Sequence, residues 1–264
     1  MYYLLEHQVQ YCEVDRNFRL QLGALFRLLH EATTEHCKLL GNGMRAQQQA
    51  GCAWAVRKFG LQLFHRPDYG EQIRVSTWIQ QVKKITFHRE FEITANGKEV
   101  AEASSQWVSL DLRRRQITRS RILIDHEYVI ERTTGVSDEL KQWTRPSNVP
   151  TEYHMEVRLR SSDFDTNGHV NNAAYFDYLE TLLFQYYGFI PTPLAICMQF
   201  TREISTDIAV VKVGISPSEQ TQYYKIYDKD SVYALGEITI PKEKIPAKKH
   251  KQTGSQAEHQ FQLQ

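Results

Sequence analysis

The sequence predicts an α+β fold made of two similar halves, in each of which an antiparallel sheet wraps one long helix. Three observations support this prediction. Each half has one long apolar helical pattern, four alternating strand patterns follow each helix, and the chain partly repeats itself at an offset of 150 residues. With 264 residues, 41% of them hydrophobic, the chain is long enough for two compact domains.

The repeat at an offset of 150 falls on the most polar part of each half. Few identities are involved, so chance matching is the alternative to an internal duplication. The matched pairs are Asp15 with Asp165, Asn17 with Asn167, Ala24 with Ala174 and Leu29 with Leu179.

Two long helices are predicted from apolar residues spaced three or four apart. The first covers Leu20 to Leu40 and ends at Gly41. The second follows Asn167 and Gly168, which supply turn and capping chemistry, and stops at Gly188. At 1.5 Å per residue, about 18 residues give the second helix a length of ~27 Å.

Eight strands are predicted from alternation and from their β-branched and aromatic residues. An Asn-Gly pair at 96–97 predicts a hairpin between the third and the fourth, because both residues tolerate positive φ. The strands cover Trp54–Phe64, Gln72–Val82, Thr86–Ala95, Glu99–Leu110, Leu194–Ile204, Ala209–Ile215, Gln222–Tyr227 and Val232–Ile240.

Polar segments set the expected domain boundaries. We expect an N-terminal domain over 1–130, a polar linker with scattered prolines over 131–155 and a C-terminal domain over 156–241. Residues 242–264 are rich in Lys, Gln and His and have almost no apolar side chains. Such a segment cannot offset the ~1 to 2 kcal/mol per residue that ordering costs, so we expect a disordered tail.

Charge and cysteine content limit the classes of function. The net charge is +1, so no overall field favours nucleic acid or a membrane surface as partner. Four cysteines form no C-x-x-C pair and no zinc-ligand spacing, which fits a reducing compartment. No signal peptide is recognisable, and no apolar run approaches the ~18 residues that span a bilayer. We therefore expect a soluble, cytoplasmic protein.

The most informative stretch is Asp163–Asn172, which gathers two carboxylates, three amides and one imidazole where the second helix begins. Free N–H groups at a helix start can hold a carboxylate or a developing oxyanion, which suits attack on a thioester carbonyl. The structural alternative is that Asp165 and Asn167 only cap and turn, and that His169 is a structural histidine whose hydrogen bonds are satisfied.

A further carboxylate, Glu203, stands near the end of the strand predicted over Leu194–Ile204. Alternation places Glu203 at the end of the row formed by Cys197, Gln199 and Thr201. If this strand lies against the second helix, Glu203 approaches His169 and Asp165 and can act as a general base on water. A surface glutamate at a strand end is the alternative.

The first half keeps part of this polar set. It retains Asp15 and Asn17 but has Arg19 where the imidazole would be, and a gapped alignment places Arg66 where the glutamate would be. The sequence therefore predicts one active site, in the second half.

The string Asp165-Thr166-Asn167-Gly168-His169-Val170-Asn171-Asn172, with Tyr175 and Leu179-Glu180, resembles the acyl-ACP thioesterase family. The resemblance covers about residues 5 to 240 and extends to Met198–Glu203, Trp54–Arg57, His65–Pro67 and Trp107-Val108. It implies a double, or tandem, hot-dog fold. It also implies hydrolysis of fatty acyl thioesters on acyl carrier protein to free fatty acid, ending fatty-acid synthesis, with no metal or organic cofactor.

Carried over by position, the family's catalytic residues become Asp165, Asn167, His169 and Glu203. In such enzymes the C-terminal half is catalytic and the N-terminal half houses the acyl chain. We expect Glu203 to activate water, His169 to orient it and shuttle a proton, Asp165 to fix the imidazole, and Asn167 with a helix-start N–H to bind the oxyanion.

Two departures from plant members of the family are informative. They carry a cysteine directly after the glutamate, whereas this chain has Ile204, which favours Glu203 with water over a Cys/His pair. They also carry a plastid transit peptide, which is absent here, so we expect a bacterial member.

Acyl carrier protein is acidic, so a basic docking patch is expected, with solvated loop charges as the alternative. Competing functions are an acyl-CoA thioesterase on the same scaffold, a noncatalytic acyl-binding hot-dog protein and a hot-dog dehydratase. A homodimer is conceivable, because sheet edges tend to pair. Patch candidates are Arg113, Arg114, Arg115, Arg119 and Arg121.

Overall fold

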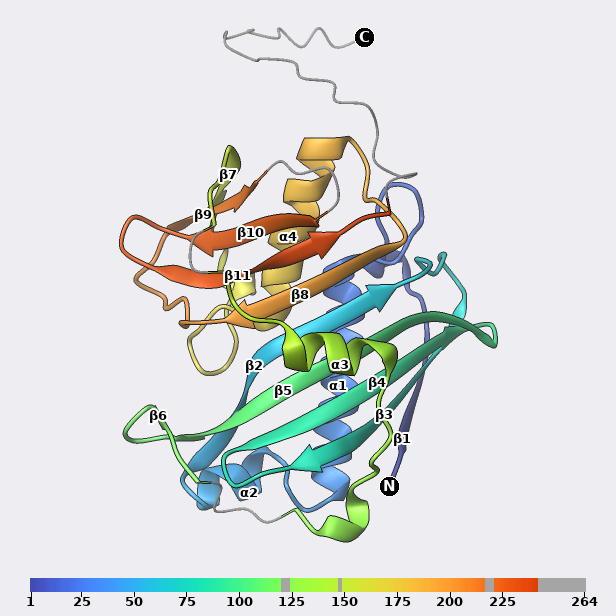
Figure 1. Cartoon of the computed structure of the whole chain (residues 1–264), viewed down its shortest axis with the longest axis vertical. Helices are drawn as coiled ribbons and strands as arrows, with labels where there is room; N and C mark the ends of the chain where they lie inside the picture. Colours follow the sequence, from blue (N-terminus) through green and yellow to red (C-terminus); the bar gives the residue numbers. More distant parts are fainter. Residues whose placement is uncertain (120–123, 147–148, 217–220, 242–264) are drawn as a thin grey trace, which may run out of the picture.

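The computed structural model in Figure 1 describes residues 1–119, 124–146, 149–216 and 221–241. The expected disordered tail, 242–264, lies outside the described residues, and so does Arg121. Among the described helices, none combines the length and the apolarity that crossing a membrane would require.

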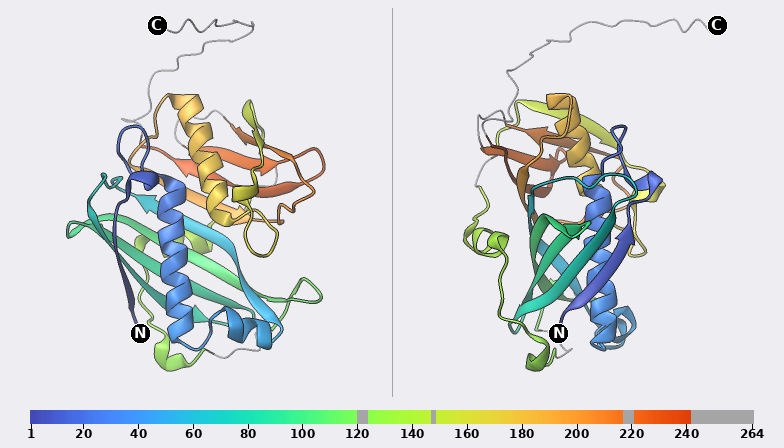
Figure 2. Two further views of the ribbon diagram at one scale, coloured as in Figure 1. Left: turned by 180° about the vertical axis from the view of Figure 1, so that it is seen from behind. Right: turned by 90° about the vertical axis from the view of Figure 1, so that its right-hand side faces the viewer.

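A single antiparallel sheet runs through both halves, and two long helices lie on the same side of it (Figure 2). These helices are α1 (Leu22–Leu39) and α4 (Asn172–Tyr187). The strand order is β1-β3-β4-β5-β2-β8-β11-β10-β9-β7, with β6 paired to β5. The α+β prediction is confirmed, with one long helix and one stretch of antiparallel sheet in each half.

The first-half strands are β1 (Tyr3–Gln8), β2 (Cys52–Leu63), β3 (Gln72–Val82), β4 (Thr86–Ala95), β5 (Lys98–Asp111) and β6 (Gln116–Ile117). The second-half strands are β7 (Tyr153–Arg158), β8 (Leu194–Phe200), β9 (Val210–Ile215), β10 (Thr221–Tyr227) and β11 (Val232–Thr239). All eight predicted strands are present. The hairpin is confirmed too, with φ of 48° at Asn96 and 78° at Gly97.

Strands β1 and β7 were not predicted, and both form an outer edge of the sheet. Their sequences contain almost no β-branched residues, and each half-buries only alternate side chains. Propensity and periodicity are therefore weak there, and these strands form because β3 and β9 supply pairing partners.

Strand β8 is shorter than predicted and ends at Phe200 instead of Ile204. The N–H groups of Thr201 and Arg202 both donate to the carbonyl of Tyr233, at 2.8 and 3.3 Å, so the regular ladder stops there. Glu203 therefore does not stand in the predicted row of strand side chains, and a turn sets its position.

Between the halves, the segment expected to be a linker contains helix α3 (Gly135–Gln142). It covers the sheet face opposite the long helices (Figure 1). Val136 and Leu140 lie directly over Gly60, where a Cβ would meet them within 3.4 Å, so a larger residue there would displace the helix. A second short helix, α2 (Met44–Gln49), follows α1.

The two halves share one hydrophobic core, because α1 and α4 pack against each other. Phe26 of α1 stacks on Phe176 of α4 with ring centroids 4.6 Å apart, and both rings meet the edge of Phe59 in β2. At the centre of the sheet, β2 pairs with β8 from Lys58 opposite Gln199 to Leu63 opposite Leu194. This packing sets the start of each long helix beside the other half.

Candidate active site

The polar motif forms a tight loop that leads into α4. Gly168 has a φ of 74°, which glycine adopts without strain, and its N–H donates to the Asp165 carbonyl at 3.1 Å. One Asp165 carboxylate oxygen accepts the N–H groups of Asn167 and His169, at 2.8 and 3.3 Å. Asp165 thus holds the main chain of His169, whereas the expectation was a contact with the imidazole ring.

Asn167 lies exposed on this loop, and its side-chain amide donates to the other oxygen of Asp165 at 3.3 Å. It was expected to cap the helix and to bind an oxyanion. Helix α4 begins instead at Asn172, and Asn171 caps it by accepting the N–H of Ala173 at 2.9 Å. Asn167 therefore shapes the loop and does not cap the helix.

Glu203 and His169 are brought together as the motif predicted. Glu203 Oε2 lies 3.1 Å from His169 Nε2. The N–H of Val170 donates to the carbonyl of Ile204 at 2.9 Å, which ties the loop to the turn after β8. The Glu203 side chain is 51% exposed and the His169 side chain only 17%, so water reaches the carboxylate while the imidazole is held.

Arg115 completes this cluster from the other half of the chain. Its Nη1 lies 3.4 Å from His169 Nε2 and 3.5 Å from Glu203 Oε2. Arg115 stands in the turn between β5 and β6 with a φ of 51°. It was predicted only as part of a docking patch, since no local pattern links a hairpin to a motif about 50 residues away.

The first half repeats the loop with different side chains. Asp15 accepts the N–H groups of Asn17 and Arg19 at 2.7 and 3.1 Å, as Asp165 does in the second half. The same main-chain turn is therefore built twice, which supports an internal duplication.

The residue equivalent to Glu203 follows from a matching backbone bond. Leu20 donates its N–H to the carbonyl of Pro67 at 2.8 Å, just as Val170 donates to the residue after Glu203. Arg66 precedes Pro67, so it occupies the place of Glu203, as the gapped alignment predicted. The first half thus has a buried cation where the second has an accessible carboxylate.

Arg66 is 3% exposed and forms two ion pairs, at 2.9 Å with Asp15 and at 2.8 Å with Glu180 of α4. The other oxygen of Glu180 accepts the N–H of Leu22, the first residue of α1, at 2.7 Å. Burial raises the pKa of Glu180 to about 7, against the opposing effects of Arg66 and the Leu22 N–H. The Glu180 carboxylate of the second half therefore binds the free N–H at the start of helix α1 in the first half.

The same offset of 150 relates Glu180 to His30 of α1 and Leu22 to Asn172. Within the described residues, the N–H of Asn172 has no hydrogen-bond acceptor. His30 is exposed as a whole residue, but loss of hydration around its ring lowers its pKa, against the opposing charges of Glu31 and Asp165. His30 is thus close enough to feel the charge of Asp165, and it aligns with Glu180 in the internal repeat.

A narrow cavity of about 10 Å³ lies between α1 and the first-half sheet, beside His30. The His30 ring stacks on Trp107, with centroids 6.3 Å apart and an angle of 10°. The apolar wall suits an alkyl chain, but the volume requires side chains to move before one enters. The lining residues are Phe26, Leu29, His30, Thr33, Val56, Phe59, Phe91, Ser105 and Trp107.

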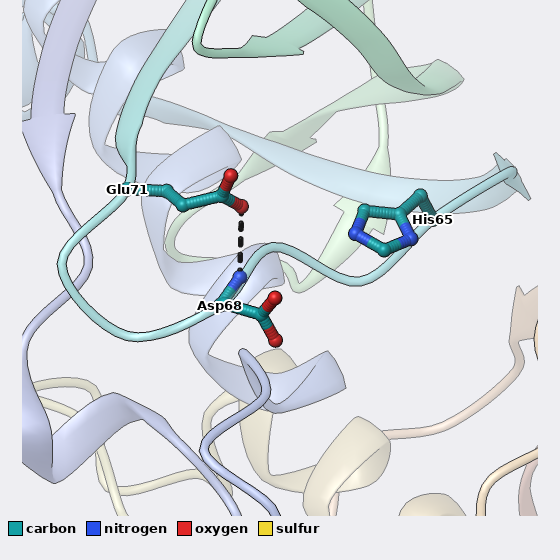
Figure 3. Close-up of side chains that lie close together, drawn as sticks. All are labelled: His65, Asp68 and Glu71. Carbon is teal, nitrogen blue, oxygen red and sulfur yellow. Dashed lines mark hydrogen bonds between the residues drawn. The ribbon is translucent and has the colours of Figure 1, made fainter.

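One cluster has the donor types of a metal site, namely His65, Asp68 and Glu71 (Figure 3). Glu71 already accepts the N–H of Asp68 at 2.9 Å and the side-chain amide of Asn96 at 2.8 Å. These bonds close the turn between β2 and β3, which accounts for the cluster without a ligand.

Comparison with known families gives two matches that together cover most of the chain. Residues 2–128 match the model of the acyl-ACP thioesterase N-terminal domain, and residues 147–260 match that of the C-terminal domain.

Named relatives are distant. An acyl-[acyl-carrier-protein] hydrolase (FATB3, chloroplastic) of Cuphea viscosissima is 25% identical over 177 residues, which is 63% of this chain and 42% of the relative. Oleoyl-acyl carrier protein thioesterase 1 of Arabidopsis thaliana is 22% identical over 224 residues, 78% of this chain and 62% of the relative. The chain thus spans about half the length of these relatives.

Solved structures share the fold over nearly their whole length. An acyl-ACP thioesterase from Bacteroides thetaiotaomicron superposes with a TM-score of 0.74 at 19% identity, covering 90% of this chain and 97% of that one. The 12:0-ACP thioesterase from Umbellularia californica gives 0.75 at 19% identity, covering 90% and 96%. The tandem hot-dog prediction is confirmed.

Proposed function

The chain belongs to the acyl-ACP thioesterase family, and we propose that it hydrolyses fatty acyl thioesters of acyl carrier protein to free fatty acid and carrier thiol. The observation that carries the proposal is the contact of Glu203 with His169, 3.1 Å, beside the open start of α4. An accessible carboxylate, a held imidazole and a free helix-start N–H can supply a general base and an oxyanion donor for hydrolysis of a thioester.

In this proposal Glu203 is the general base. Its carboxylate is open to water and takes a proton while the water oxygen bonds to the thioester carbon. His169 and Arg115 flank the same carboxylate oxygen and orient it. When the intermediate collapses, the carbon–sulfur bond breaks and the proton passes to the leaving thiolate.

The oxyanion is assigned to the N–H of Asn172. Helix starts favour negative charge, and this N–H is free among the described residues. The first half supports the assignment, because there the equivalent N–H, that of Leu22, binds a carboxylate oxygen of Glu180. Asn167, expected to share this role, acts through Asp165 instead.

We also propose that the two halves have different functions, one in catalysis and one in binding the acyl chain. Residues 156–241 would form the catalytic domain, 1–130 the domain that houses the acyl chain, and 131–155 their connection. Supporting it, the cavity is lined only by residues of the first half, and His30 leads from that cavity toward Asp165. The acyl chain would displace the His30–Trp107 stack as it enters.

Acyl carrier protein is the proposed partner, docked on the hairpin that carries Arg113, Arg114 and Arg115. The hairpin is exposed, and Asp111 holds its turn by accepting the N–H groups of Arg113 and Arg114, each at 2.9 Å. Arg115 reaches the catalytic pair, so this hairpin could bring the carrier's thioester to Glu203. The homodimer remains a prediction.

We also propose a cytoplasmic location. All four cysteines are free thiols, and three of them are buried, which suits a reducing compartment. Fractionation of cells with antibody detection tests this, and recovery of the protein from an oxidising compartment would contradict it.

One assay tests the substrate class. Purified protein is incubated with acyl-ACPs of graded chain length and with the matching acyl-CoAs, and the released acids are identified. The proposal requires free acid from acyl-ACP with higher kcat/KM than from acyl-CoA. A preference for acyl-CoA would favour the alternative thioesterase, and no release would favour a noncatalytic acyl-binding protein.

A further inference from the structure

Arg89 of β4 is a completely buried cation, and the described residues give it no counter-ion. It is 0% exposed and lies between α1 and the sheet. Its Nη1 contacts His36 Nδ1 at 2.8 Å and Thr77 Oγ1 at 3.2 Å, and its Nη2 lies 3.5 Å from Cys37 Sγ. No carboxylate of the described residues pairs with it.

The three partners, His36, Thr77 and Cys37, include no carboxylate. Burial and the nearby Arg89 lower the pKa of His36 to about 3, so this imidazole is neutral. A guanidinium stays protonated in proteins, so the positive charge of Arg89 remains. Burying an ion without a partner costs several kcal/mol, which makes such a group unusual in a folded protein.

One edge of the guanidinium has unused donors. Among the described residues, Arg89 Nε has no hydrogen-bond partner, and neither does His36 Nε2. Nη2, which shares that edge with Nε, has only the long contact to sulfur. The edge formed by Nε and Nη2 is the fork that binds a carboxylate through two parallel hydrogen bonds.

Arg89 lies directly behind the inner wall of the cavity. Ser105 is its cross-strand partner, Phe91 follows it on the same face of β4, and Thr33 precedes His36 by one helical turn. All three line the cavity. His30, at the active-site side, is six residues from His36 on α1, a distance of ~9 Å along the helix.

We propose that the acyl chamber ends in an oxygen-binding site at Arg89, and that the enzyme takes acyl chains with a carboxylate near the end remote from the thioester. This inference rests on the proposed function and adds the substrate class. The thioester lies at Glu203, the alkyl portion lies along Phe26, Leu29 and Phe59, and the remote carboxylate reaches Nε and Nη2 of Arg89. A remote hydroxyl would use one of the same donors and bind less tightly.

The test compares acyl-ACPs of equal length that end in a methyl group, a hydroxyl or a carboxylate, over a graded series of lengths. At the length that spans the chamber, wild-type kcat/KM should be higher for the carboxylate than for the methyl group by about ten- to a hundredfold, the value of a hydrogen bond to a charged group. Equal values at every length would overturn the proposal, whatever the variants do.

Two variants separate binding from structure. Arg89→Met should remove the preference, so that kcat/KM for the carboxylate-ended chain falls to about that for the methyl-ended chain. Phe91→Leu, a control in the cavity wall, should keep the preference. If Arg89→Met does not fold, Arg89→Lys serves, since an ammonium cannot form the two-bond fork and should reduce the preference. A preference that either Arg89 variant retains in full would contradict the site.

Binding of free acids distinguishes failure of this inference from failure of the proposed function. Dicarboxylic and monocarboxylic acids of equal length are titrated into wild-type protein and into Arg89→Met by calorimetry. Tighter binding of the dicarboxylic acid to wild type alone supports the site even where no thioester is hydrolysed. Equal binding, together with thioester hydrolysis, would reject the site and leave the proposed function standing.

Discussion

The carboxylate of Glu180 accepts the N–H of Leu22 at 2.7 Å, so a residue of the second half closes the helix start of the first. The corresponding start of α4 has a free N–H at Asn172 among the described residues. By the internal repeat, Glu203 stands where the first half has the buried Arg66, and His30 stands where the second half has Glu180. The two halves therefore share one anion-binding position at the start of the long helix. In α1 the Glu180 carboxylate occupies it, and in α4 no described residue does.

Replacing Glu180 with alanine should destabilise the protein by roughly 2 to 4 kcal/mol, because the half-buried Asp15 is then the one counter-ion that the described residues give Arg66. Urea unfolding measures the free energy. The matched control is Glu156→Ala, which removes an exposed ion pair with Lys212 and should change stability by less than about 1 kcal/mol. An equal decrease in the free energy of unfolding in the two variants would show that the buried ion pair stabilises the protein no more than the exposed one.

The polar edge of His30 is expected to donate a hydrogen bond to the thioester, since its equivalent in the second half, Glu180, accepts the helix-start N–H of Leu22. His30→Phe keeps a ring to stack on Trp107 but loses the hydrogen bond, so kcat/KM for acyl-ACP should fall about tenfold. The thermal midpoint should not change. His65→Phe, at an exposed turn, is the control, and matching kinetics in both variants would dismiss the role of His30.

Docking through the basic hairpin predicts a salt-dependent effect on KM. Changing Arg113, Arg114 and Arg119 to glutamate should raise KM for acyl-ACP by about tenfold and weaken its salt dependence. Hydrolysis of an acyl-pantetheine, which has no carrier protein, should be unaffected. The control reverses Lys225 and Lys229, and an unchanged KM in the Arg variant would count against docking on the hairpin.

Local patterns accounted for both helices and eight strands, because each is long and strongly periodic. The edge strands β1 and β7 and helix α3 depend on partners distant in the sequence, so their short, mixed patterns were not informative. In the site, Glu203 meets His169 as predicted, yet through a turn and not through the strand row.

Three groups of the site had no local signal. Arg115 comes from a hairpin of the other half, His30 lies among ordinary helical residues, and Asn172 contributes a main-chain N–H that a sequence does not display. Tertiary structure brings Arg115 to His169 and packs α1, which carries His30, against α4, which begins at Asn172.

Stability should fall in acid because of His88. Burial, with Lys141, Lys83 and Lys58 nearby, lowers the pKa of His88 to about 4. The unfolded chain therefore binds more protons between about pH 6.5 and 4, so the free energy of unfolding decreases as pH falls through that window. The loss from this group reaches roughly 3 kcal/mol at pH 4.

His88→Gln should remove that part of the acid loss, which urea unfolding at pH 7 and at pH 4 would measure. Carboxylates titrate in the same range, so the difference between wild type and variant is the relevant quantity. Identical acid losses in the two proteins would show that His88 is not responsible.

The general base is tested most directly by steady-state hydrolysis of acyl-ACP with Glu203→Gln. The amide cannot accept the proton of water, so kcat should fall by at least about a hundredfold. The thermal midpoint should stay at the wild-type value, since the side chain is 51% exposed. Glu6→Gln, which changes an exposed glutamate paired with Arg74, should keep full activity. Wild-type turnover by Glu203→Gln would contradict the assignment of Glu203 as the base.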